Sequence, residues 1–469
     1  MKLILSNDIE IQKAPKELLE KIRQRLTMFN PKWFENERMG YLNRGVPKVL
    51  QYFMEDKISF AVPRGFYSEL ISMCDKKPDI LDLRSVQKPV SFTFNTEERP
   101  YQDEAIAIML CHDQGVLQAP TGSGKTIMAL SIIAARRQPT LIIVHTKELL
   151  YQWKDRIETF LSIPKEDIGQ IGDGKKTVGK KITVAMVQTL FKCADKVAPK
   201  IGHLVVDETH RVVSRCFDEA VSYFDCKYFL GLSATPFRRD KLTNLIWWFI
   251  GPKIHEIRIE EMIEKKAILP IDVIMRQSLF KTNYDPINQY SLMIKELTED
   301  EERNKLIIND AAEEAYNGVA LILSDRKTHC LTLQTMLSEK GIESVLLTGD
   351  CSSQERKQII ERIGQNKERI VIATGQLIGE GFDCKNLSSL FLSTPIRFSG
   401  RLLQYLGRVL RPAKGKEKAM IYDYVDIHIR QLVNSAKERA RIYRKEFNCD
   451  EELFRSKEER PKAMYNRRS

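Results

Sequence analysis

Two successive series of short apolar segments, separated by helical stretches, constrain the fold of this chain most strongly. The first series lies within residues 115–235 and the second within residues 271–425. Examples are TLIIVH (140–145), ITVAMV (182–187), HLVVDE (203–208), VALILS (319–324), RIVIAT (369–374) and SLFLST (389–394). Continuous apolar runs that alternate with helices are typical of parallel strands covered by helices on both faces. The sequence therefore predicts an α/β fold with two similar parallel-sheet domains in tandem.

The two series also predict how the chain is divided. Their join lies near Gly251-Pro252, and a flank remains outside them at each end. We expect a small N-terminal α+β accessory domain at residues 1–90 and a first parallel-sheet domain at residues 91–252. We expect a second parallel-sheet domain at residues 253–426 and a charged helical tail at residues 427–469.

Composition excludes several classes of protein. Charged residues make up 29% of the 469 residues and hydrophobic ones 43%, which argues against global disorder. No apolar run approaches the roughly 20 residues of a membrane span, and the first residues do not form a secretory signal. The nine cysteines form no CxxC pair, so neither a zinc site nor a disulfide framework is indicated. We expect an intracellular protein, and its net charge of +11 permits a polyanionic partner such as nucleic acid.

A phosphate-binding loop is the firmest functional signal. The strand GVLQA is followed by APTGSGKT (119–126) and then by a helical stretch. Glycines let backbone N–H groups approach phosphate oxygens, and the helix N-terminus adds a favourable dipole. We expect Lys125 to contact the β- and γ-phosphates of ATP and Thr126 to bind Mg²⁺. The loop residues predicted to hold the nucleotide are Pro120, Thr121, Gly122, Ser123, Gly124, Lys125 and Thr126. The alternative is a chance glycine-rich turn.

An acidic pair follows the strand HLVV, in the segment DETH (207–210). Ligands of parallel sheets bind where the strands end, so both carboxylates are expected at the nucleotide. Asp207 is expected to hold Mg²⁺ through water, and Glu208 to orient and deprotonate the attacking water. The alternative is an ordinary acidic helix cap.

The order of these segments resembles that of the superfamily-two helicases. APTGSGKT, DETH, LSATP (232–236) and QYLGRVLR (404–411) resemble their motifs I, II, III and VI. RPYQ (99–102), HTKELLYQW (145–153), MVQTL (186–190) and ATGQLIGEGFD (373–383) resemble further motifs in the same order. DETH and the Gln that opens motif VI resemble DNA translocases of the XPB type and phage helicases of the UvsW type more than DEAD-box RNA helicases. The resemblance implies two RecA-like domains that use ATP and Mg²⁺.

The resemblance also implies roles for individual residues. Arg408 and Arg411 would be arginine fingers, and their spacing of three places them on one face of a helix. Gln404 belongs to the same motif. Further nucleotide contacts are implied for Arg99, Gln102, Gly381 and Asp383, and coupling roles for His210, Ser233 and Thr235. The alternatives are surface arginines for Arg408 and Arg411, helix caps for Ser233 and Thr235, and a plain surface glutamine for Gln102.

Nucleic acid is the expected partner, held mainly through phosphates. The helicase resemblance implies contacts at Thr146, Lys147, Gln188, Thr189 and Thr374. The N-terminal segment 29–53 interleaves cations with aromatic residues, and residues 1–90 carry a net charge of +4. Its candidate DNA contacts are Lys32, Trp33, Arg38, Tyr41 and Arg44. The alternative is that these aromatic residues form the core of their own domain. For the tail, a solvated helix and a DNA contact remain equally open.

We therefore predict an ATP-dependent DNA helicase or translocase that acts on duplex or branched DNA in repair, recombination or replication. Branch migration fits the UvsW resemblance. The alternatives are an ATP-dependent RNA helicase, the motor subunit of a restriction system, and a non-enzymatic ATP switch. Such a protein is expected in the cytoplasm, or in the nucleus if the source is a eukaryote.

Overall fold

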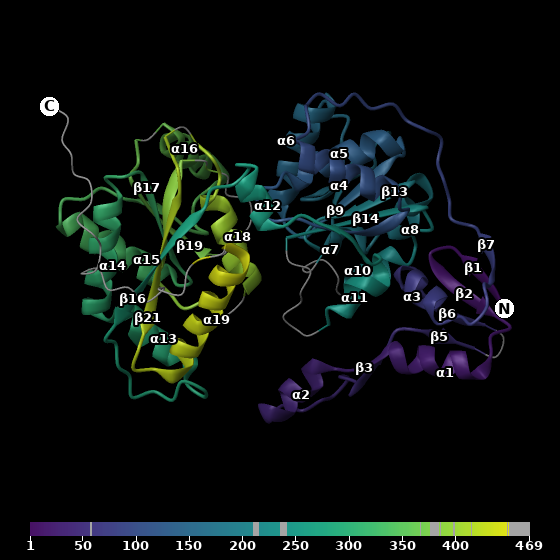
Figure 1. The fold of residues 1–469 in the computed structure, drawn as a ribbon, viewed down its shortest axis with the longest axis horizontal. Coiled ribbons are helices and arrows are strands. Elements are labelled where there is room, and N and C mark those ends of the chain that lie inside the picture. Colours follow the sequence, from purple (N-terminus) through teal and green to yellow (C-terminus); the bar gives the residue numbers. More distant parts are fainter. Residues whose placement is uncertain are drawn as a thin grey trace. The chain divides into compact units, whose positions relative to one another are not determined.

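The structure, a computed structural model, is drawn as a ribbon in Figure 1. It describes residues 1–56, 59–209, 215–234, 242–365, 367–375, 384, 386–396, 399–413, 415–447 and 449. The chain divides into two units. The first contains Met1–Ala119 and Gly124–Ile257, and the second contains Pro120–Ser123 and Arg258–Ser469.

The larger sheet of the first unit has eight strands in the order β11-β10-β12-β9-β13-β14-β8-β15. Neighbouring strands are parallel except for β10 and β11, which are antiparallel. The strands are β8 (Gln114–Gln118), β9 (Thr140–Val144), β10 (Gly169–Gly172), β11 (Lys175–Thr177), β12 (Ile182–Met186), β13 (His203–Val206), β14 (Tyr228–Ser233) and β15 (Lys253–Glu256). Every residue of β9 and β13 is buried, as their continuous apolar sequences predict.

Helices connect these strands and cover the sheet (Figure 1). They are α4 (Pro100–Leu110), α5 (Lys125–Arg136), α6 (Lys147–Leu161), α7 (Val187–Leu190), α8 (Ala194–Val197), α10 (Arg215–Val221) and α11 (Asn244–Phe249), with a 3₁₀ turn, η2, at Ala198–Lys200. The amphipathic helix α6 turns Leu150, Trp153 and Ile157 inward at the spacing of a helical face.

The N-terminal part of the first unit forms a five-stranded sheet in the order β5-β6-β2-β1-β7. Its strands are β1 (Lys2–Leu5), β2 (Asp8–Gln12), β5 (Met54–Glu55), β6 (Phe60–Pro63) and β7 (Asp79–Asp82). Its helices are α1 (Lys16–Arg25), η1 (Arg64–Phe66) and α3 (Tyr67–Ser72). A small accessory lobe, residues 27–51, contains β3 (Thr27–Phe29), α2 (Pro31–Arg38) and β4 (Val49–Gln51).

The N-terminal sheet and the larger sheet share one hydrophobic core. Leu3 and Ile9 belong to the same buried cluster as Val116 and Phe229. The core is therefore continuous across residue 90, the boundary expected from sequence. That boundary stays a prediction.

Arg64 anchors the N-terminal part to the larger sheet. Its guanidinium lies 3.9 Å from the centre of the Phe229 ring and is almost fully buried. Two of its nitrogens donate to the backbone carbonyls of Cys226 (2.8 Å) and Lys227 (3.1 Å), and its Nε donates to the side chain of Gln114 (3.0 Å). Burial lowers the pKa of Arg64 to about 10, so the guanidinium remains charged at neutral pH.

The second unit is built on a six-stranded parallel sheet in the order β16-β21-β20-β17-β19-β18. The strands are β16 (Ile271–Ser278), β17 (Val319–Ser324), β18 (Val345–Leu347), β19 (Ile370–Thr374), β20 (Leu387–Leu392) and β21 (Ala419–Asp426). The helices are α12 (Ile259–Glu264), α13 (Tyr290–Glu299), α14 (Glu301–Glu314), α15 (Lys327–Glu339), α16 (Ser353–Gly364), α18 (Ser399–Val409) and α19 (Arg430–Phe447). Together the two units confirm the predicted α/β class.

Helix α19 is fixed to the sheet by a buried ion pair and a hydrogen bond to Asp423 of β21. Two nitrogens of Arg439 donate to the carboxylate of Asp423, at 2.7 and 2.6 Å, and the Tyr443 hydroxyl donates to the same carboxylate at 3.0 Å. Leu432, Tyr443 and Phe447 are buried on the same helix. The alternative of a solvated helix is therefore wrong for residues 430–447, because one face of this helix belongs to the core of the second unit.

A further polar network ties α14 to the same strand. Arg303 is buried and donates to Asp426 (2.8 Å), while Arg276 donates to Asp310 (2.9 Å). The Tyr424 hydroxyl also donates to Asp310, at 3.2 Å. Burying ionised groups is tolerated where each has a close partner of opposite charge. In the part of the chain that the structure describes, no helix is both long enough and apolar enough to cross a membrane.

Candidate nucleotide and nucleic-acid sites

The phosphate loop lies between β8 and α5, as the sequence predicts. The backbone N–H of Ala119 donates to the carbonyl of Ser233 at the end of β14, at 2.9 Å. Gly122 and Gly124 have φ values of +94° and +85°, in the left-handed region that favours glycine. A Cβ atom at Gly124 would lie 2.3 Å from the side-chain nitrogen of Gln102, so a larger residue would have to displace that side chain as well as adopt a strained φ. The Nζ of Lys125 donates to the Ala119 carbonyl at 2.9 Å, across the base of the loop.

Pro120, Thr121 and Ser123 form the tip of this loop, where the backbone N–H of Ser123 donates to the Pro120 carbonyl at 3.2 Å. Thr126 follows in the first turn of α5. Backbone N–H groups at the start of a helix and the Lys125 ammonium offer favourable interactions to phosphate oxygens. The loop therefore fits a nucleoside triphosphate.

Asp207 lies directly after β13 and is buried. One of its carboxylate oxygens accepts a hydrogen bond from the Trp153 indole nitrogen at 2.8 Å, and the other accepts from the backbone N–H of Glu208 at 2.9 Å. Burial and the neighbouring Glu208 carboxylate raise the pKa of Asp207, whereas the Trp153 hydrogen bond and the Lys125 charge act in the opposite direction. The two donors thus favour the ionised carboxylate that a magnesium ion requires.

Glu208 has a φ of +49°, a strained conformation for a residue other than glycine. Such strain is concentrated at functional sites, where surrounding structure enforces it. A nucleotide-bound Mg²⁺ usually takes one or two protein oxygens and completes its shell with phosphates and water. Asp207 and the hydroxyl of Thr126 are oxygen donors of the right kind, so the residues present fit this ion.

Gln102 lies beside the loop on helix α4. Its carbonyl oxygen accepts from the backbone N–H of Arg99 at 2.9 Å, and its amide nitrogen faces Gly124. Only 4% of Gln102 is exposed, so the alternative of a plain surface glutamine is wrong. The Arg99 side chain lies 3.5 Å from the Tyr101 hydroxyl.

Several predicted residues have limited or no structural description. Ser233 is buried at the end of β14 and its carbonyl joins the loop, as above. Gln404 lies on α18, but its side chain is outside the described part. His210, Thr235, Gly381 and Asp383 all lie outside the described residues.

The two motif VI arginines do not share a helix face. Helix α18 ends at Val409, so Arg408 lies in its last turn and Arg411 lies beyond it. The prediction of a shared face is therefore wrong. The physical reason is Pro412, because a residue before proline is disfavoured in the helical conformation. The side chain of Lys416 donates to the carbonyls of Val409 and, at 3.1 Å, Arg411, which holds this non-helical segment in place.

Thr146, Lys147 and Gln188 lie close together at the carboxyl edge of the larger sheet. Thr146 caps helix α6, since its hydroxyl accepts from the backbone N–H of Leu149 at 3.3 Å. The Gln188 amide donates to the His145 carbonyl at 3.2 Å. The structure thus brings together the ends of β9 and β12, which are paired in parallel.

Thr189 follows Gln188 in the short helix α7, and Thr374 ends β19 in the second unit.

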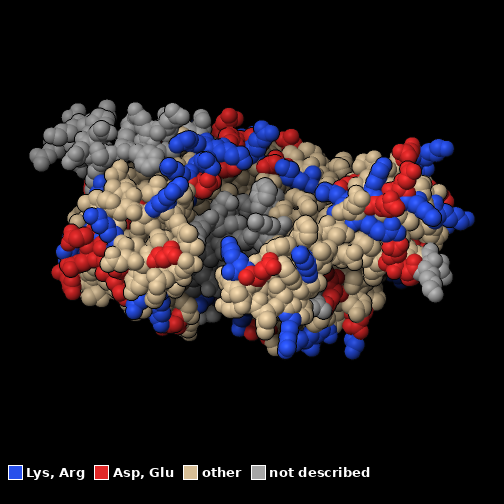
Figure 2. Space-filling view, turned by 90° about the horizontal axis from the view of Figure 1, so that it is seen from below, with Lys and Arg blue, Asp and Glu red and all other residues tan. Residues whose placement is uncertain are grey.

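Figure 2 shows basic and acidic side chains intermixed over one face of the molecule, rather than a surface with charge of one sign.

The predicted N-terminal contacts lie on the accessory lobe. Arg38, Tyr41 and Arg44 are exposed, and Lys32 forms an exposed ion pair with Glu35 at 3.0 Å. Trp33 is half-buried, because its ring packs against Phe34 and carries the Lys48 ammonium 4.8 Å from its centre. Trp33 therefore supports the lobe, whereas Tyr41, which is 63% exposed, presents its ring to solvent.

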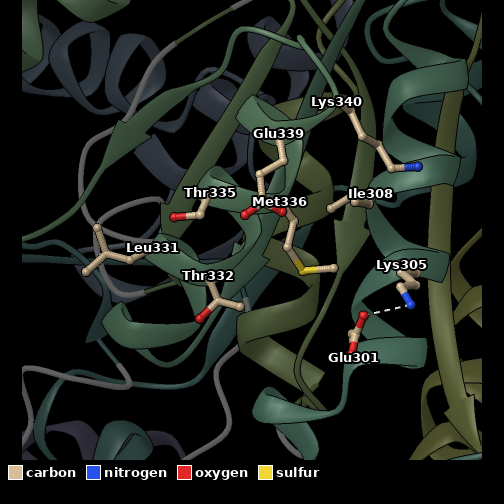
Figure 3. Close-up of a pocket in the computed structure, with 9 residues that line it drawn as sticks. All are labelled: Glu301, Lys305, Ile308, Leu331, Thr332, Thr335, Met336, Glu339 and Lys340. Carbon is tan, nitrogen blue, oxygen red and sulfur yellow. Dashed lines mark ion pairs between the residues drawn. The ribbon is translucent and has the colours of Figure 1, made fainter.

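A separate groove of about 580 Å³ lies between α14 and α15 in the second unit (Figure 3). Ile308, Leu331 and Met336 supply its apolar surface, and the Glu301–Lys305 ion pair (2.7 Å) stands at one side. None of the predicted site residues lines it.

Comparison with known proteins agrees with this geometry. Residues 95–238 match the family described as the res subunit of type III restriction enzymes, and residues 302–413 match the helicase conserved C-terminal domain. The chain is thus a helicase with two RecA-like domains, and its family implies that it uses ATP.

Among relatives, the DNA 3′-5′ translocase XPB2 of Sulfurisphaera tokodaii is 27% identical over 69% of this chain and 81% of its own length. The protein named probable helicase D10 of Escherichia phage T5 is 24% identical over 91% of this chain and 90% of its own. The structure of Saccharomyces cerevisiae Dbp5 bound to RNA and ADP BeF3 shares the fold, with a TM-score of 0.53 and 16% identity over 76% of this chain and 89% of that one. The prediction of a superfamily-two helicase that resembles XPB-type proteins and phage helicases is confirmed.

Sequence reasoning missed Trp153, Lys416 and Arg64. Trp153 lay inside a recognised motif, HTKELLYQW, but its bond to Asp207 spans 54 positions and has no local signal. Pro412 was a local signal that Arg411 leaves the helix.

Proposed function

We propose that this protein is an ATP-dependent DNA helicase or translocase that remodels duplex or branched DNA during repair, recombination or replication. Asp207 carries the proposal. It is the buried carboxylate directly after β13, in the same sheet as the phosphate loop, and it accepts hydrogen bonds from the Trp153 indole and the Glu208 backbone N–H. The similarity to the DNA 3′-5′ translocase XPB2 of Sulfurisphaera tokodaii supports DNA as the substrate. Action on DNA would place the protein in the cytoplasm of a bacterial or phage-infected cell, or in a nucleus.

In this proposal the loop residues bind the triphosphate. Lys125 neutralises charge on the β- and γ-phosphates. Thr126, and Asp207 through water, would hold Mg²⁺, and the bound ion would supply positive charge to the phosphates. Glu208 orients the attacking water and accepts its proton. Arg408 and Arg411 stabilise the charge that develops on the transferred phosphoryl group.

Gln102 and Arg99 are proposed to contact the nucleotide next to the loop, together with Gly381 and Asp383. Gln404 completes motif VI, and His210, Ser233 and Thr235 are proposed to couple hydrolysis to the grip on nucleic acid. Thr146, Lys147, Gln188, Thr189 and Thr374 are the proposed backbone contacts in the two RecA-like domains.

The accessory lobe is proposed to direct the motor to branched DNA. Phe29, Tyr41 and Leu42 are 66%, 63% and 82% exposed, which is unusual for large apolar side chains in one small lobe. Aromatic faces of this kind stack on unpaired bases, while Arg38 and Arg44 reach phosphates. The similarity of residues 95–238 to a restriction subunit keeps a restriction motor as a second candidate.

The test is a strand-remodelling assay on forked and four-way DNA, with linear duplex DNA and an RNA duplex as controls. We expect ATP-dependent conversion of the branched substrates and no conversion of the RNA. The double variant Arg38→Ala/Arg44→Ala should lower activity on branched DNA more than on linear DNA. Conversion of RNA but not DNA would contradict the proposed substrate. Equal losses on all DNA forms would contradict the role of the lobe.

A further inference from the structure

The hairpin formed by β10 and β11 has a concentrated positive charge. Asp173 and Gly174 make its two-residue turn, with φ values of +49° and +78°, the pattern of a tight Asp-Gly hairpin. Residues 174–181, GKKTVGKK, contain four lysines and no acidic residue. These lysines are all exposed, and they are Lys175, Lys176, Lys180 and Lys181.

The turn of the hairpin lies at the carboxyl ends of the strands, where the predicted nucleic-acid contacts Thr146 and Gln188 also lie. β10, β12 and β9 are neighbours and run parallel, so the turn after β10 lies on the same side as the ends of β12 and β9. Thr146 follows β9 and Gln188 follows β12. In open parallel sheets, ligands bind at the carboxyl ends of the strands.

Two side chains of α6 bind the turn directly. The Lys147 ammonium lies 2.7 Å from one carboxylate oxygen of Asp173, and the Tyr151 hydroxyl donates to the other at 2.5 Å. These two contacts lower the pKa of Asp173, so its carboxylate is ionised and balances the charge of Lys147. The unbalanced positive charge beside the turn therefore comes from the hairpin lysines and not from Lys147.

We propose that the β10–β11 hairpin binds the phosphate backbone of nucleic acid and extends the contact surface that begins at Thr146 and Gln188. This inference rests on the proposed function. Lysine ammonium groups on an exposed hairpin bind phosphates without regard to base sequence and release counterions as they do so. Because Lys147 and Tyr151 of α6 bind Asp173, the turn holds Lys175 and Lys176 close to the start of α6.

The same lysines have a structural alternative. β11 is the edge strand of its sheet, and charged residues on edge strands, lysine above all, prevent strand pairing between molecules. That role predicts aggregation of charge-neutral variants but no effect on nucleic-acid binding. Binding and solubility therefore separate the two explanations.

The experiment compares full-length Lys175→Gln/Lys176→Gln with a matched control, Lys76→Gln/Lys77→Gln. The control pair is also consecutive and exposed, lies in the same unit, and is outside segment 29–53. Fluorescence anisotropy measures binding of a labelled duplex across a salt series. Two lost phosphate contacts should reduce the slope of log K against log salt by about 1.8, with the largest loss of affinity at low salt.

We expect the control variant to bind like wild-type protein, and both variants to keep the ATP hydrolysis rate measured without nucleic acid. If Lys175→Gln/Lys176→Gln aggregates, Lys180→Gln/Lys181→Gln, which lies outside the edge strand, serves in its place. A wild-type slope and affinity in the hairpin variant would overturn the proposal while leaving the helicase assignment intact. Absence of nucleic-acid binding by the wild-type protein would instead contradict the proposed function itself.

Discussion

The indole nitrogen of Trp153 donates a 2.8 Å hydrogen bond to the carboxylate of Asp207, and both side chains are buried. Trp153 lies on α6, whose first residue is the nucleic-acid candidate Lys147, whereas Asp207 directly follows β13. The bond thus joins the helix that begins at the nucleic-acid edge to the residue proposed to hold Mg²⁺. It orients the carboxylate through a donor that carries no charge of its own.

Replacing Trp153 by Phe keeps an aromatic ring and removes the donor. A hydrogen bond to a charged group contributes about 1.5–3 kcal/mol, so we expect roughly a tenfold or greater loss in kcat and a higher Mg²⁺ requirement. Nucleotide binding measured by fluorescence at varied Mg²⁺ should show the same weakening without turnover. The half-buried Trp247→Phe is the matched control. Identical Mg²⁺ curves for both variants would show that Trp153 only fills space.

Arg408→Ala and Arg411→Ala should each retain ATP binding but lose hydrolysis. Arginine fingers stabilise transition-state charge more than ground-state phosphate, so kcat should fall by about 10³ or more while KM changes little. Steady-state kinetics of each variant measures this. Since Arg411 lies outside α18, its loss should not alter helix content by circular dichroism. Parental rates in both variants would refute the assignment of motif VI.

Lys416 gives a pH-dependent stability with a defined sign. Burial lowers the pKa of Lys416 from 10.5 to about 8. The nearby Arg411 guanidinium also acts to lower this pKa, whereas the Cys384 thiol acts to raise it. Between these two values the unfolded state binds more protons than the folded state, so raising the pH stabilises the fold. Below about pH 8 the folded chain carries the full cost of the buried ammonium.

We expect the thermal midpoint of wild-type protein to rise relative to Lys416→Met as the pH increases from 8 to 10. Titrating groups that do not interact with Lys416 cancel in this difference, because both proteins contain them. Differential scanning calorimetry at several pH values measures it. A difference that stays constant or shrinks with pH would mean that the Lys416 ammonium is solvated.

Arg64→Met should destabilise the first unit. It leaves the carbonyls of Cys226 and Lys227 without their donors, and each buried unsatisfied group costs about 1–3 kcal/mol. A chain that begins at residue 91 should aggregate for a different reason. It uncovers the apolar side chains of the larger sheet that pack against the N-terminal part. Thermal unfolding and size-exclusion chromatography test both statements. A soluble, folded truncated chain would show that residues 1–90 are a separable domain.

The strands and the phosphate loop were predictable because their signals are local. A run such as TLIIV is typical of a strand buried on both faces in a helix-covered parallel sheet, and GSGK places glycine where positive φ is needed. The contacts that orient the site are not local. Trp153 meets Asp207 through the packing of α6 on the sheet, and Arg439 of the expected tail meets Asp423 only after α19 folds back. No pattern in the sequence encodes such distances.

The most direct test of the proposed helicase activity is steady-state ATP hydrolysis with and without nucleic acid. Wild-type protein should need Mg²⁺ and be stimulated by DNA, more by forked or four-way forms than by RNA. Lys125→Ala and Glu208→Gln should lose at least about 10²-fold in kcat, because each removes a group that acts in the transition state. Both variants should keep the wild-type circular dichroism spectrum. Turnover at the wild-type rate in either variant, or a wild-type rate that DNA does not change, would contradict the account.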